Sequence, residues 1–495
     1  METEETVGLV GSIAGAGRGS VGAGMIYNLI ARFAFLFGGY VLHIALARIL
    51  GPIAYGVMGV VLPLVTIARV LVMDGPRQAI SKFTAENEDL AGVIRAAALR
   101  LEGLLSLGVL VTMLAGAGPL ATLLRDPNLA PYIRLVAPMV PFTALMSVYL
   151  ASLNGLHAFG QQAVATVVYS LGRVALGVVG GWFWGLPGAL LGLVLSPLLA
   201  LATAHILLPA NRRGGHFPAR RIIHFSIPMI VFAVGDALLM YLDLLFVKAI
   251  VSEGTRVGYY TAAATVAQIP YYVLLALADT LLPVTARLLE QGQPERARHT
   301  IATGLRYGLM LLVPAATLIA TTARPLMAVI YGHAYIPAGP PLAVLIWGQT
   351  FYAFSTVLTA LLIAEGKPGR AMVLAISLLP ISAGLNILLV PRYGLLGAAS
   401  STTIATLVGF LASLLLVWRD FGAILYGRPL LAIGGAAGLS GALALWWRPQ
   451  GALLFPAYLA LWAVDILLLW FLGGLDSEDW RRLGALAPRR LRSSL

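Results

Sequence analysis

The chain has 495 residues, of which 59% are hydrophobic and only 11% are charged, and its formal net charge is +12. Soluble domains carry about 25% charged residues, so this composition excludes a water-soluble protein and predicts an integral membrane protein. Cysteine is absent, which excludes disulfides and thiolate metal sites. The positive charge fits the excess of Lys and Arg in the cytoplasmic segments of membrane proteins, so we expect no nucleic-acid partner.

Apolar segments of about 20 residues, the length that crosses a bilayer as a helix, recur from end to end. The alternating segments of ~10 residues that build a membrane β-barrel are not found. We therefore expect an all-α integral membrane protein with about fourteen transmembrane helices and, from the first 21 residues, no cleavable signal peptide. The predicted spans are 25–47, 53–73, 93–117, 132–153, 162–183, 186–209, 224–250, 257–282, 302–323, 340–364, 371–390, 395–418, 429–447 and 452–474.

Polar turns separate the spans, for example at 48–56 and 74–82. Lys and Arg concentrate in alternate connections, such as 210–223, 283–301 and the C-terminal tail. Because positive charge favours the cytoplasmic side, this bias predicts that both termini lie in the cytoplasm. It also supports an even number of spans.

Three pairs of residues recur at an interval of 205 positions, which indicates an internal repeat. They are Tyr55 and Tyr260, Asp74 and Asp279, and Lys82 and Arg287. Spans one to six and seven to twelve are then two copies with the same orientation, an arrangement known from transporters. The predicted domains are a cytoplasmic tail (1–24), an N-lobe (25–209), a basic linker (210–223), a C-lobe (224–418), two further spans (419–474) and a basic cytoplasmic tail (475–495).

The segments LARILGPIAYG (46–56) and DGPRQAISKFTAE (74–86) resemble the multidrug/oligosaccharidyl-lipid/polysaccharide exporter superfamily. FSIPMIV (225–231) and VGYYTAAATVAQIP (257–270) add to this resemblance. Two extra C-terminal spans favour its polysaccharide flippase branch, which contains the O-antigen-type, lipid II and sporulation proteins. The resemblance implies two six-helix lobes forming a V around a central cavity, with the extra pair providing a groove for a polyprenyl tail. It also implies a multi-pass protein of the bacterial cytoplasmic membrane.

The expected substrate is a polyprenyl-pyrophosphate-linked sugar or oligosaccharide that moves from the inner to the outer leaflet by alternating access. Arginine suits pyrophosphate because its guanidinium donates two parallel hydrogen bonds. Arg32 lies within the first predicted span, one helical turn from Asn28, and Arg173 lies within the fifth. Charged residues inside spans usually face protein or water. We therefore expect Asn28, Arg32 and Arg173 to bind substrate, although structural pairing or snorkelling remains the alternative.

Acidic residues in the seventh span are candidates for ion pairs or for coupling. Asp236 and Asp243 lie on one helical face, and Lys248 follows near the outer end. They could pair with Arg32 or bind a coupling proton or sodium ion, and a structural salt bridge is the alternative. Three residues at the cytoplasmic ends of the second and eighth spans are gate candidates: Arg69, Asp74 and Asp279.

Two other functions compete with the flippase. A multidrug/cation antiporter of the same superfamily would need an acidic or aromatic cavity, whereas Arg32 and Arg173 favour anions. A membrane glycan polymerase or acyltransferase would need a large external loop, which no connection supplies. We expect a non-enzymatic monomer without metal or cofactor, with coupling to protons, sodium ions or the membrane potential left open. Membrane lipids, and glycosyltransferases or polymerases of the same pathway, are the expected partners.

Overall fold

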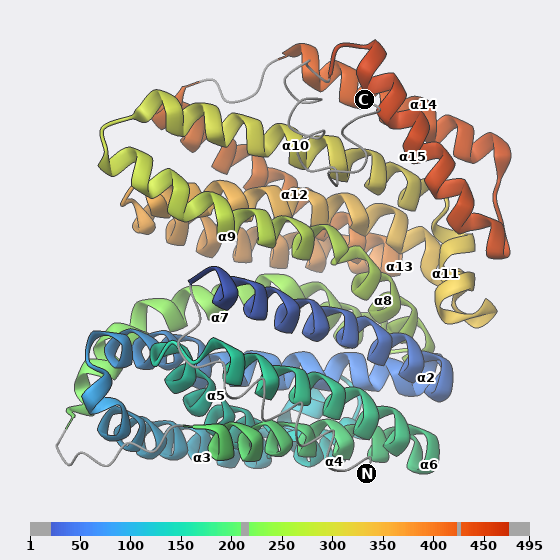
Figure 1. Cartoon of the computed structure of the whole chain (residues 1–495). Coiled ribbons are helices and arrows are strands. Elements are labelled where there is room, and N and C mark those ends of the chain that lie inside the picture. Colours follow the sequence, from blue (N-terminus) through green and yellow to red (C-terminus); the bar gives the residue numbers. More distant parts are fainter. Residues whose placement is uncertain (1–20, 209–216, 423–426, 475–495) are drawn as a thin grey trace, which may run out of the picture. The chain divides into compact units, whose positions relative to one another are not determined.

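The computed structural model describes residues 21–208, 217–422 and 427–474, and within these ranges the chain is helical without strands (Figure 1). The predicted C-terminal tail, most of the N-terminal tail and half of the basic linker lie outside the described residues. Ten helices in the described part are long and apolar enough to cross a membrane. An all-α multi-pass membrane protein is therefore confirmed.

The chain divides into two compact units, residues 1–261 and 262–495. In the first unit the helices are α2 (Val21–Glu86), α3 (Ala91–Leu123), α4 (Leu129–Val136), α5 (Met139–Gly155), α6 (Phe159–Leu207), α7 (Ala219–Val251) and the larger part of α8 (Gly254–Ala267), with a short 3₁₀ helix η1 (Glu88–Leu90). In the second unit they are α9 (Ile269–Glu290), α10 (Pro294–Thr321), α11 (Ala323–Tyr331), α12 (Gly339–Ala364), α13 (Pro368–Phe421), α14 (Gly427–Trp447) and α15 (Leu454–Phe471), with η2 (His333–Ala338) and η3 (Gly451–Leu453).

Three of the long helices contain two segments that meet at a kink. The kinks lie at Gly51 in α2, Gly185 in α6 and Gly394 in α13, each with a positive φ. Gly51, for example, has φ 72° and ψ 173°, a conformation that is essentially restricted to glycine. Each kink falls at a predicted boundary between two spans, so the short polar breaks in the sequence correspond to real changes of direction.

The predicted turn at 74–82 is wrong, because α2 continues as a helix to Glu86. Its last turns are held by packing: Ala79 and Ile80 are fully buried against Ile94 of α3 and Ile222 of α7. Gly75 lies directly against α7, where an added Cβ would come within 2.6 Å of the Ser226 carbonyl oxygen. Close packing therefore outweighs the helix-breaking tendency of the Asp-Gly-Pro sequence.

In the first unit, α2 is the central helix and contacts α3, α5, α6 and α7. Because α7 packs along α2, the boundary between the compact units falls within α8, after the predicted linker. The predicted lobes rest on a sequence repeat and not on contacts, so they stay a prediction.

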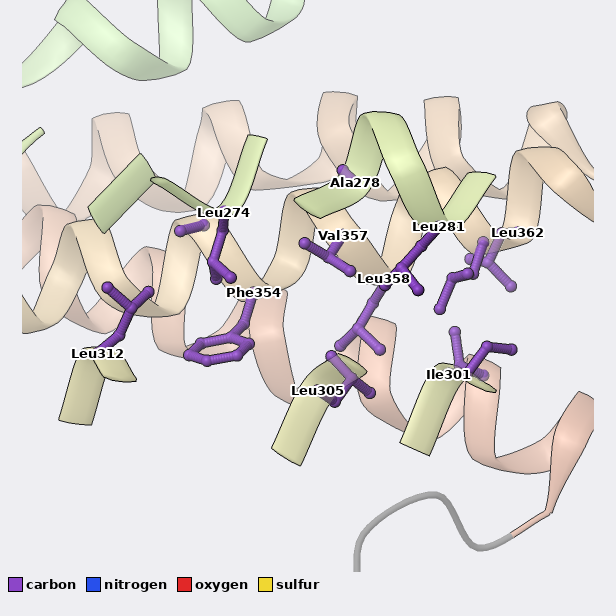
Figure 2. Packing of buried hydrophobic residues seen from close by; sticks show 13 residues of the cluster. Leu274, Ala278, Leu281, Ile301, Leu305, Leu312, Phe354, Val357, Leu358 and Leu362 are labelled. Atoms are coloured by element: carbon purple, nitrogen blue, oxygen red, sulfur yellow. The ribbon is translucent and has the colours of Figure 1, made fainter. Parts of the chain in front are cut away.

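In the second unit, α12 is central and packs against α9, α10 and α13. Figure 2 shows the apolar cluster that they share, with Leu274 and Leu281 from α9, Leu305 from α10 and Phe354 and Leu358 from α12. The last two helices join this unit through α10: α14 packs on α10, and α15 packs on α14.

Candidate functional site

Arg173 is fixed at the contact between α6 and the first half of α2. Its Nη2 donates to the Phe35 carbonyl oxygen at 3.1 Å, and its guanidinium carbon lies 4.4 Å from the centre of the Phe35 ring. The Tyr169 ring lies at 5.8 Å on the same helix as Arg173. A Cβ at Gly39 would come within 3.1 Å of Nη2, so glycine at this position leaves room for the guanidinium.

The other two substrate-binding candidates lie on the same half of α2. Arg32 is half-buried and lies one turn before Phe35, the residue that contacts Arg173. Asn28 lies a further turn toward the N-terminus, and its side chain is outside the described residues. Ser170 ties the two helices together by donating to the Ala34 carbonyl oxygen at 2.7 Å. The structure thus brings the segment that carries Asn28 and Arg32 against the helix that carries Arg173.

A second polar region lies where α7 packs along the second half of α2. The charges of Arg69 on α2 and Asp236 on α7 both act on the hydroxyl of Tyr241. The contact between the helices thus gathers a cation, an anion and a phenol. The sequence prediction missed Tyr241, because a spacing of five residues from Asp236 does not place two side chains on one face of a helix.

Asp243 is buried and accepts a hydrogen bond from the Tyr260 hydroxyl at 2.7 Å. In the other copy of the predicted repeat, the Tyr55 hydroxyl is hydrogen-bonded to His43 Nδ1 at 3.0 Å. Both tyrosines are fully buried, and both reach back to a polar residue on the preceding helical segment. The two positions of the repeat thus have the same structural role, which anchors one helix to the next.

Lys248 forms an ion pair with Asp126, a residue in the loop between α3 and α4, and not with Asp236 or Asp243. Its Nζ lies 2.6 Å from Asp126 Oδ2, and the lysine side chain is 3% exposed. The contact fastens the end of α7 to the end of α3. Sequence spacing cannot reveal a partner 122 positions away, and Asp126 was therefore not among the predicted site residues.

Two of the three gate candidates, Arg69 and Asp74, lie on α2 of the first unit. Within the described ranges no ion pair joins Arg69 to Asp74, both of which are half-buried on α2. Asp279 lies on α9, and its side chain is outside the described residues. Their role as a gate stays a prediction.

Two buried carboxyl groups were also missed. Glu102 of α3 and Asp465 of α15 are 0% and 2% exposed. Each is the one acidic residue in its predicted span. A charged residue within a predicted span was also the reason for selecting Arg173, so the sequence contained a signal for both. Among the residues that the structure describes, no group of three His, Asp or Glu side chains could hold a metal ion.

The fold and these polar helix contacts define a class, that of multi-pass membrane proteins with ionisable groups buried between helices. The family described as "Polysaccharide biosynthesis protein" matches residues 45–340, more than half of the chain. The chain therefore belongs to this family, within the polysaccharide flippase branch of the multidrug/oligosaccharidyl-lipid/polysaccharide exporter superfamily.

Curated relatives share low identity with the chain. Stage V sporulation protein B of Bacillus subtilis is 23% identical over 421 residues, which are 77% of this chain and 78% of that protein. The probable low-salt glycan biosynthesis flippase Agl15 of Haloferax volcanii is 21% identical, and the uncharacterized membrane protein MJ1068 of Methanocaldococcus jannaschii is 24% identical. Each of the latter two matches covers 187 residues, and the chain spans only 39% and 36% of those proteins.

Two solved structures show the same fold. The lipid II flippase MurJ in an inward closed conformation matches with a TM-score of 0.72 and 16% identity, over 93% of this chain and 99% of that one. An inward-facing multidrug resistance MATE family transporter matches with a TM-score of 0.64 and 17% identity, over 83% of this chain and 97% of that one. At these identities the likeness concerns the fold alone.

Proposed function

We propose that the protein is a flippase for a polyprenyl-pyrophosphate-linked sugar or oligosaccharide. The observation that carries this proposal is the match of residues 45–340 to the polysaccharide biosynthesis family. Two similar proteins support it by their names, a probable glycan biosynthesis flippase and a lipid II flippase. The substrate would move from the inner to the outer leaflet of a bacterial cytoplasmic membrane, with both chain termini inside.

Fourteen spans are compatible with the described helices. Three of the ten apolar helices contain a second segment beyond a glycine kink. We assign α8 and α9 together as one further span. We assign two six-helix lobes and an extra pair, α14 and α15, on the basis of the sequence repeat. The protein would act as a monomer beside the glycosyltransferases or polymerases that make or use its substrate.

Transfer of such a lipid makes and breaks no covalent bond, so the protein must lower the free energy of a charged head group within the membrane. Arginine is suited to this task because its planar guanidinium binds phosphate with two hydrogen bonds and remains charged. Arg173 and Arg32 lie on adjacent helices of the first unit, and Arg173 is already oriented by Phe35. We assign pyrophosphate binding to these arginines, with Asn28 close by on α2.

The flippase can be tested with purified protein in liposomes that contain a fluorescent polyprenyl-pyrophosphate disaccharide. A membrane-impermeant quencher distinguishes the leaflets, and protein should make the inner pool accessible at a rate that empty liposomes do not reach. Export of ethidium without movement of the lipid would instead establish the multidrug antiporter, whose fold is similar.

A further inference from the structure

Glu102 lies on the face of α3 that is buried against α5. Ala98, Glu102 and Ser106 recur every four residues along this face, and all three are fully buried. Glu102 lies nine positions into the predicted span 93–117, which is about 14 Å along a helix at 1.5 Å per residue. A carboxyl group at that depth is far from bulk water, where its ionised form is strongly disfavoured unless donors surround it.

Few donors reach this carboxyl group. Ser147 of α5 donates to Oε2 at 3.4 Å, a long hydrogen bond, and Oε1 is buried without a partner in the described part of the chain. Two nearby hydroxyls on the same helix faces are directed elsewhere: Ser106 donates to the Gly103 carbonyl oxygen at 3.1 Å, and Thr143 to that of Met139 at 2.7 Å. Two or three donated hydrogen bonds can stabilise a carboxylate in its charged form, and the described residues supply one long hydrogen bond here.

Among the described residues, no cation forms an ion pair with Glu102 that would replace the missing donors. Helices α2, α4, α5 and α7 pack against α3, and among their described residues none forms an ion pair with Glu102. Two titratable groups lie along the α3–α5 contact itself. The guanidinium carbon of Arg95 lies 6.0 Å from the centre of the Tyr149 ring. On the other helices, Lys82 pairs with Glu86 and Lys248 pairs with Asp126, and Arg134 is exposed. The half-buried Arg69 of α2 lies near Tyr241 of α7.

We propose that Glu102 is a proton-binding site of the first unit. In the packed state its carboxyl group is neutral, with the proton on one oxygen and the Ser147 hydroxyl directed at Oε2. Separation of α3 from α5 would admit water, which takes the proton and solvates the carboxylate. Proton occupancy and the packing of α3 on α5 are thereby linked, since the charged form is favoured only when the contact opens.

The role of this proton in transport rests on the proposed function: a proton released and rebound at Glu102 in each cycle would couple lipid movement to a pH gradient. The site differs from Asp236 and Asp243, the acidic residues that the sequence suggested for coupling. Asp243 already accepts a hydrogen bond from Tyr260 at 2.7 Å, whereas Glu102 has, among the described residues, only the long contact with Ser147.

Protonation can be measured without any substrate by infrared spectroscopy of the purified protein at neutral pH. We expect a C=O band of a protonated carboxylic acid that disappears in Glu102→Gln, a neutral replacement that preserves the packed state. Asp465→Asn is the matched control: Asp465 is a second buried carboxyl group, and its replacement should leave the Glu102 band in place. Ser147→Ala removes the one donor, so the Glu102 band should persist to higher pH than in the unmodified protein. A spectrum at neutral pH in which Glu102→Gln removes only a carboxylate band would overturn the proposal.

The coupling is measured in liposomes with and without an imposed pH gradient. We expect the gradient to accelerate lipid movement by the unmodified protein and to have no effect on Glu102→Gln, which still moves the lipid without a gradient. An equal acceleration in the variant would contradict coupling through Glu102. Absence of lipid movement in the unmodified protein would count against the flippase, while the infrared result would still decide the protonation state.

Discussion

Individual polar residues in the first unit hold helices together across long sequence separations. Lys248 and Asp126 lie 122 positions apart and approach to 2.6 Å. Asp243 and Tyr260 form a similar link between α7 and α8. A buried charge that loses its partner is strongly destabilising, so these contacts restrict which rearrangements of α7 are accessible.

The Lys248–Asp126 ion pair gives an asymmetric prediction for stability. Asp126→Asn leaves a lysine that is 3% exposed without its counter-ion and should lower the free energy of unfolding by about 3 kcal/mol, as in other broken buried pairs. Lys248→Met should be milder, because the aspartate side chain is 22% exposed and water can solvate it. Thermal unfolding in detergent measures both effects.

The exposed pair Arg256–Glu253 is the control for this comparison. Its atoms approach to 2.8 Å, but both side chains are 56% exposed, so Arg256→Met should change stability by less than about 1 kcal/mol. Equal losses for Asp126→Asn and Arg256→Met would show that burial of Lys248 has no energetic consequence.

At the scale of helices, close packing of small residues decides how α2 and α8 meet. A Cβ at Gly258 would lie 1.9 Å from the Pro52 carbonyl oxygen, and one at Gly56 would lie 2.7 Å from the Gly258 nitrogen. Lipid supplies no hydrophobic force between membrane helices, so van der Waals contact of this kind carries much of their association.

Gly258→Ala should therefore force α8 away from α2 and lower the free energy of unfolding by about 1–3 kcal/mol, the usual range for overpacking. Gly108→Ala is the control: it lies in α3 with no atom within 4 Å of the added Cβ. There alanine should be neutral or stabilising, because its helix propensity exceeds that of glycine. A Gly258→Ala protein as stable as Gly108→Ala would contradict this packing.

The helical elements were largely predictable, because apolar length and glycine breaks are local properties of the sequence. The kinks at Gly51, Gly185 and Gly394 fall at predicted boundaries. The continuation of α2 through Asp74 was not predictable, because it depends on the contact of Gly75 with Ser226 of α7. The same limit applies to the candidate site. The sequence singled out Arg173 as a candidate, but its aromatic and carbonyl partners on α2 depend on how the helices pack.

For the molecule as a whole, family membership and fold agree. The family match spans residues 45–340, and the MurJ fold covers 93% of the chain. We propose that arginines of the first unit bind the pyrophosphate of a lipid-linked glycan during its passage across the membrane. The phosphate groups of the lipid should then be as necessary for its movement as the arginines themselves.

The most direct measurement is the initial rate at which liposomes containing the protein move a polyprenyl-pyrophosphate disaccharide between leaflets, compared with the same lipid lacking phosphate. We expect only the pyrophosphate lipid to move, and a loss of at least about tenfold in Arg32→Ala, equivalent to 1.4 kcal/mol of lost phosphate binding. Arg173→Lys should also be slow, because lysine cannot donate the paired hydrogen bonds of a guanidinium. Arg100→Ala, at an exposed position of α3, should retain the full rate. Equal rates for both lipids, or an undiminished rate in folded Arg32→Ala and Arg173→Lys proteins, would contradict the account.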